Sequence, residues 1–134
     1  MKGLKTVLWI CALSCLLGFA FAALPWNFIK GSFNFFGLMP PAKTPITVYM
    51  FRLFLATYGL IGIFFIVLAT DPLKYDGMLL LAAYGILLTA IFCFVGGMRY
   101  RLPFKAYGYD VIFCAIAGVL LLVFRKNAMS AQSS

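Results

Sequence analysis

Two charged residues, Arg52 and Asp110, are the strongest candidates for chemistry in this chain, because each lies in or at the entrance of a long apolar run. Arg52 stands seven residues after Pro45, and Asp110 stands seven residues after Pro103. A lone charge inside a bilayer is costly, so ionisable residues in membrane spans usually pair or line a polar cavity. The sequence therefore predicts that Arg52 and Asp110 lie on the same side of the membrane, at about the same depth, and pair.

Such a pair could be structural or functional. In a structural clasp, Asp110 accepts a bidentate contact from the guanidinium group of Arg52 and joins two helices. In a functional site, the two charges form a polar pocket for an anionic headgroup or a small solute, or a relay for protons. A proton path normally shows further acids or histidines deeper in the membrane. None is present in this sequence.

The composition is that of a membrane protein. Of the 134 residues, 65% are apolar and only 10% are charged, whereas a soluble domain carries about 25% charged residues. A chain this short cannot bury so much apolar surface in a water-soluble core. The net charge of +8 comes from basic residues at the ends of apolar runs, which indicates headgroup contact rather than nucleic-acid binding.

The residue types argue against an enzyme. The chain has no histidine and no glutamate, which removes histidine-ligated haem, histidine-containing metal sites and histidine-based catalytic dyads. No nucleophile is paired with a base, so we expect no catalytic residue, no cofactor and no metal. All four cysteines fall in apolar runs without CxxC spacing, and packing is the expected role of Cys11, Cys15, Cys93 and Cys114.

The apolar runs predict an all-α fold with four transmembrane helices in one domain, residues 1–134. The expected spans are residues 6–24, 46–70, 78–98 and 107–124. Each is about 18–25 residues long, enough to cross a hydrocarbon core of about 30 Å. Small residues that recur every three or four positions mark the expected helix contacts: Ser14, Gly18 and Ala22; Ala56, Gly59 and Gly62; Gly85, Thr89, Cys93 and Gly97; Cys114 and Gly118.

The first span has features of a signal peptide, because a basic start precedes it and Ala20-Phe21-Ala22 resembles a cleavage site. Its length is sufficient to cross the membrane, so we expect it to be retained. Four spans place both termini on one side, which we expect to be the cytoplasmic side. The basic residues divide evenly between the two sides and do not decide the orientation.

The loop of residues 25–39 is unusually aromatic. Aromatic side chains favour the headgroup level of a bilayer, so the sequence predicts a short interfacial segment between the first two spans. Packing and anchoring are one role for it, and docking of another membrane subunit is the other. The candidate contact residues are Trp26, Phe28, Phe33, Phe35 and Phe36.

Several short landmarks occur together along the chain: Pro25, Phe36-Gly37-Leu38, Tyr49-Met50-Phe51-Arg52, Asp71-Pro72 and Asp110. In this combination the chain resembles small bacterial four-helix membrane proteins of the broad DoxX-like group. The resemblance implies a four-helix membrane bundle of bacterial origin with no agreed activity. The resemblance also implies an association with membrane redox systems. The residues of this chain include no obvious redox centre.

The sequence thus favours a non-catalytic accessory or scaffold subunit that packs against a larger complex of integral membrane subunits in a bacterial inner membrane. The alternative is a small carrier, or a lipid- or solute-binding protein, with a polar pocket at Arg52 and Asp110.

Overall fold

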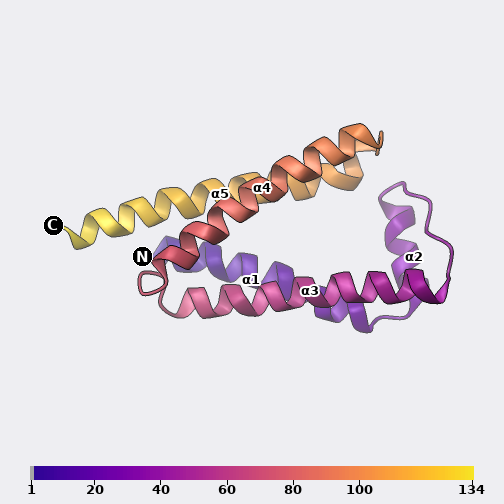
Figure 1. Ribbon diagram of the computed structural model, residues 1–134, viewed down its shortest axis with the longest axis horizontal. Helices are drawn as coiled ribbons and strands as arrows, with labels where there is room; N and C mark the ends of the chain where they lie inside the picture. The colour runs from indigo at the N-terminus through magenta and orange to yellow at the C-terminus, as the bar shows by residue number, and fades with distance from the viewer. Residues whose placement is uncertain (1) are drawn as a thin grey trace.

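All regular secondary structure in the described part of the computed structural model, residues 2–134, is helical (Figure 1). The five helices are α1 (Lys2–Ala23), α2 (Trp26–Phe35), α3 (Pro45–Thr70), α4 (Asp76–Arg99) and α5 (Phe104–Gln132). Four of them, all except α2, are long and apolar enough to cross a membrane. The all-α prediction with four spans is confirmed, and so is the short segment between the first two spans, which is the helix α2.

Local chemistry explains where α3 begins and ends. The side chain of Thr44 accepts a hydrogen bond from the backbone N–H of Thr47 at 3.2 Å, which caps the first turn. Pro45 occupies the first helical position, where its missing N–H has no cost. Pro72 follows the last turn and prevents the helix from continuing.

Helices α1 and α3 pack closely because glycines allow their backbones to approach. A Cβ atom at Gly18 would lie 2.7 Å from the carbonyl oxygen of Leu55, and one at Gly62 would lie 2.9 Å from the backbone nitrogen of Leu16. A Cβ atom at Gly59 would meet the ring of Phe19. Small residues thus form this helix contact, as the spacing predicts.

Helices α4 and α5 form a second antiparallel hairpin. The ring of Tyr107 packs on Gly97, and the side chain of Leu87 packs on Gly118. The connecting turn places Arg101 at a φ of 52°, a left-handed conformation that suits a tight reversal. Only part of the predicted small-residue face of α4 is used, because a Cβ atom at Gly85 would meet nothing within 4 Å.

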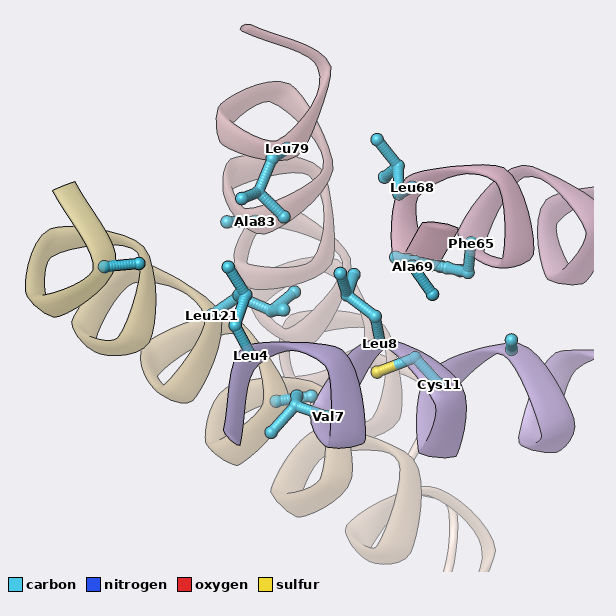
Figure 2. Close-up of a cluster of buried hydrophobic side chains, with 13 residues drawn as sticks. Leu4, Val7, Leu8, Cys11, Phe65, Leu68, Ala69, Leu79, Ala83 and Leu121 are labelled. Carbon is cyan, nitrogen blue, oxygen red and sulfur yellow. The ribbon is translucent and has the colours of Figure 1, made fainter. Parts of the chain in front are cut away.

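One apolar core joins the two hairpins near the chain termini (Figure 2). Leu4 and Leu8 of α1 point into it, and Leu121 of α5 lies beside Leu4 (Figure 2). All three side chains are fully buried. Helix α4 contributes Leu79 and Ala83, and α3 contributes the buried residues Phe65, Leu68 and Ala69.

The hairpins separate away from this core. Helices α4 and α5 run at an angle to α1 and α3, and the gap between the pairs widens toward the end where α2 lies (Figure 1). The two chain ends and the α3–α4 turn lie together at the opposite end (Figure 1). The start of α1 and the end of α5 therefore lie at the same end of the bundle.

Most of the apolar surface faces outward. Between 17% and 28% of the most apolar window of each long helix is buried inside the chain. A soluble protein rarely exposes a contiguous apolar patch larger than a few hundred Å². By length and composition the four long helices therefore mark this chain as a membrane protein, in which lipid or other proteins cover the exposed face.

Candidate functional site

The two hairpins share one core near the chain termini, which we call the closed end, and their helices diverge toward α2 and the α4–α5 turn (Figure 1). An ion pair joins the two helices of the α4–α5 hairpin at the closed end. Arg125 donates from Nε to Oδ1 of Asp76 at 2.6 Å and from Nη2 to Oδ2 at 2.7 Å. This bidentate geometry ties the first turn of α4 to the last part of α5. This pair is not among the contacts expected from the sequence.

A second polar contact lies at the closed end. Lys5 of α1 donates to the backbone carbonyl of Thr70 at 3.3 Å. Thr70 is the last residue of α3, where carbonyl groups lack partners within the helix and a cation is favoured. Each hairpin thus has one polar contact between its helices at this end.

Asp110 lies on one face of α5. Nearer the closed end, this same face packs against the α1–α3 hairpin. Ala117, Leu121 and Ala128 of that face are buried, and Cys114 is half-buried. Asp110 continues the same spacing of three and four residues, so it belongs to the same helix face. Its side chain is nevertheless exposed. The face is covered in the closed half and uncovered where the hairpins diverge.

Arg52 and Asp110 do not form the expected ion pair. The salt bridge found within residues 2–134 is the one between Asp76 and Arg125. Arg52 belongs to the α1–α3 hairpin and Asp110 to the α4–α5 hairpin, and both lie toward the end where the hairpins diverge. The side chain of Arg52 is exposed.

Tyr58 of α3 is a further polar residue near Asp110. It lies within electrostatic range of Asp110, as do Cys93 and Cys114. Its side chain is 37% exposed. The sequence contained no signal for this proximity, because it depends on the angle between the two hairpins.

Helix α2 packs on the start of α3 through aromatic rings. Phe51 contacts Trp26 edge-on, with ring centroids 6.1 Å apart, and contacts Phe33 at 5.6 Å. Of the predicted contact residues, Trp26 is buried, Phe33 and Phe36 are half-buried, and Phe28 and Phe35 are exposed. The exposed pair are 63% and 81% accessible and remain available to lipid or to a partner.

A shallow cavity of about 170 Å³ lies where the end of α1, α2 and α3 meet. Phe21, Ile29, Phe33, Phe36 and Phe51 form most of its wall, so its lining is almost entirely apolar. Neither Arg52 nor Asp110 lines it. This cavity therefore has no charged group to orient a solute.

The cysteines show no pairing. All four are free thiols, with Cys11 buried and the other three half-buried. Across residues 2–134 no cluster of cysteine and aspartate side chains has the arrangement of a metal site.

Comparison of the chain with protein-family models, with curated proteins and with solved structures finds no match.

Proposed function

We propose that this chain is a non-catalytic accessory subunit that packs against a larger membrane complex. The observation that carries the proposal is the change in exposure along one face of α5. The same helix face is fully buried at Leu121 and exposed at Asp110. A second protein packed on the exposed part of this face would extend the contact that the two hairpins make near their termini.

Two further features support this role. The polar contacts of Arg125 with Asp76 and of Lys5 with Thr70 each join the two helices of one hairpin at the closed end. Helix α2 also presents Phe28 and Phe35 on the outside of the molecule. Aromatic side chains of this kind are enriched in protein interfaces and at the headgroup level of membranes.

The carrier alternative has less support. A polar pocket made by Arg52 and Asp110 requires the two side chains to share one site, and they do not pair. The cavity beside α2 lacks a charged lining residue. The DoxX-like affiliation, and a location in a bacterial inner membrane with cytoplasmic termini, belong to the same proposal as the accessory role.

The test is affinity purification of the tagged, full-length chain from its native membranes in a mild detergent, with quantitative mass spectrometry. The proposal expects at least one integral membrane protein in constant molar ratio to the chain across independent preparations. Recovery of the chain alone, at the mass of a single copy with bound detergent and lipid, would contradict the accessory role.

A further inference from the structure

We propose that the α4–α5 turn, residues 99–105, binds anionic phospholipid headgroups in preference to zwitterionic ones. The turn connects two helices that are long and apolar enough to cross a membrane, so it lies at the surface of the bilayer. It contains no acidic residue and three basic ones: Arg99, Arg101 and Lys105. This lipid surface is separate from the protein contact proposed for α5 and does not depend on it.

The positive charge of the turn is not neutralised within the described chain. All three basic side chains are exposed. The salt bridge found in residues 2–134 joins Asp76 to Arg125, at the other end of the same hairpin. A phosphate group is the complementary ligand that a membrane surface offers, and the guanidinium group of arginine binds phosphate with two parallel hydrogen bonds.

The fold holds the basic residues at one end of the hairpin. The backbone N–H of Leu102 donates to the carbonyl group of Gly97 at 3.0 Å and closes the turn. The ring of Tyr107 packs on Gly97 across the hairpin. Arg99 and Lys105 each stand two residues nearer the turn than this contact, so they lie at one level on facing helices. Long basic side chains at such a position can reach the headgroups.

Arg101 has a backbone conformation that favours glycine. Its φ is 52°, in the left-handed region. Glycine is the usual residue at this position after a helix, because a side chain there has a conformational cost. The turn itself therefore does not require arginine. A contact of the exposed guanidinium group outside the chain accounts for a charged residue at a strained position.

Aromatic side chains around the turn favour lipid over a soluble acidic partner. Tyr100 is 75% exposed, Phe104 is 62% exposed and Tyr109 is 68% exposed. Exposed aromatic rings are enriched at the headgroup level of membranes. The tyrosine hydroxyl groups can also donate hydrogen bonds to phosphate or ester oxygens. The surface thus combines positive charge with side chains suited to the membrane interface.

The experiment is photo-crosslinking of the full-length chain with p-benzoylphenylalanine in place of Tyr100. The chain is reconstituted in vesicles with equal amounts of phosphatidylglycerol and phosphatidylcholine, and mass spectrometry gives the ratio of the two lipids in the adducts. Arg101→Gly removes one charge and suits the backbone conformation, whereas Arg101→Lys keeps the charge. Lys126→Gln is the matched control, because it removes one exposed charge near the closed end.

We expect phosphatidylglycerol to be enriched in the adducts by about fivefold or more over its proportion in the vesicles. Arg101→Gly should lower this enrichment by about threefold to fivefold, since a basic residue near an anionic surface has an effect of that size. Arg101→Lys should retain most of the enrichment, and Lys126→Gln should not change it. Neutralisation of all three basic residues of the turn should abolish it, and high salt should weaken it.

Four results would overturn the inference: adducts in the proportion of the vesicle lipids, adducts only with a second copy of the chain, enrichment that Arg101→Gly leaves unchanged, or an equal loss in Lys126→Gln. The last result would mean that the total charge of the chain, and not the turn, attracts the lipid. Because glycine suits the backbone at position 101, a loss of lipid preference in Arg101→Gly does not reflect a loss of folding. Circular dichroism of each variant checks this.

Discussion

Asp76 and Arg125 clamp the ends of α4 and α5 together through two parallel hydrogen bonds of 2.6 and 2.7 Å. The two residues stand at nearly equal distances from the turn at Tyr100 and Arg101. This is the position that an antiparallel helical hairpin gives to facing residues. The pair is partly exposed at the expected headgroup level, where its charges keep some contact with water.

Asp76→Ala and Arg125→Ala should each lower the free energy of unfolding, because each removes one partner of a bidentate pair. A double-mutant cycle should give a coupling energy of about 0.5–1 kcal/mol, as expected for an ion pair that is partly exposed. Unfolding in mixed detergent micelles would measure it. Additive effects of the two substitutions would show that the pair contributes nothing to stability.

Gly62→Val should separate α1 from α3, because the added side chain would meet the backbone of Leu16 and Ala12 within about 3.0 Å. Overpacking of this kind costs about 1–3 kcal/mol. Gly85→Val is the matched control, since a Cβ atom there meets nothing within 4 Å. Thermal unfolding should show a clear loss of stability for the first variant and little change for the second. Equal loss in both would mean that α1 and α3 do not pack through Gly62.

Arg52→Ala and Asp110→Asn should show no energetic coupling within the isolated chain. The two side chains make no salt bridge and belong to different hairpins. The double-mutant cycle should therefore give additive changes in unfolding free energy, within about 0.3–0.5 kcal/mol. A coupling energy above about 1 kcal/mol would show that the two charges pair and that the hairpins close on each other.

Phe51→Ala should release α2 from the start of α3, because Trp26 and Phe33 both pack on that ring. Trp26 is 5% exposed, so its release should shift its fluorescence. The measurement uses Trp9→Phe chains, in which Trp26 is the remaining tryptophan. Phe35→Ala, at a ring that is 81% exposed, serves as the control. An unchanged spectrum after Phe51→Ala would show that contacts other than those of Phe51 hold α2 on α3.

The sequence predicted the elements of the fold well and their arrangement less well. Apolar runs located all four spans because helix formation in lipid depends on local composition and length. The helices extend beyond the predicted spans, as in α5, which continues to Gln132, because a helix need not end at the edge of the apolar run. Gly18, Gly59 and Gly62 were recognisable as a close contact because their spacing is local.

The candidate site was predicted only in part. Arg52 and Asp110 each stand seven residues after a proline, which suggested that they lie at the same depth and pair. Pairing depends on the angle between the two hairpins, which no local pattern encodes. The pair of Asp76 and Arg125 was detectable in principle, because an antiparallel register about the turn at Arg101 places them opposite each other. Tyr58 was not detectable, since its closeness to Asp110 arises only from the packing of all four spans.

The measurement that tests the central claim most directly is the mass of the native particle that contains this chain, determined by native mass spectrometry directly after mild solubilisation. The chain alone has a mass of 14.9 kDa. The accessory role predicts a larger particle that contains a different integral membrane protein in fixed proportion. A particle that consists of this chain and lipid alone would contradict it.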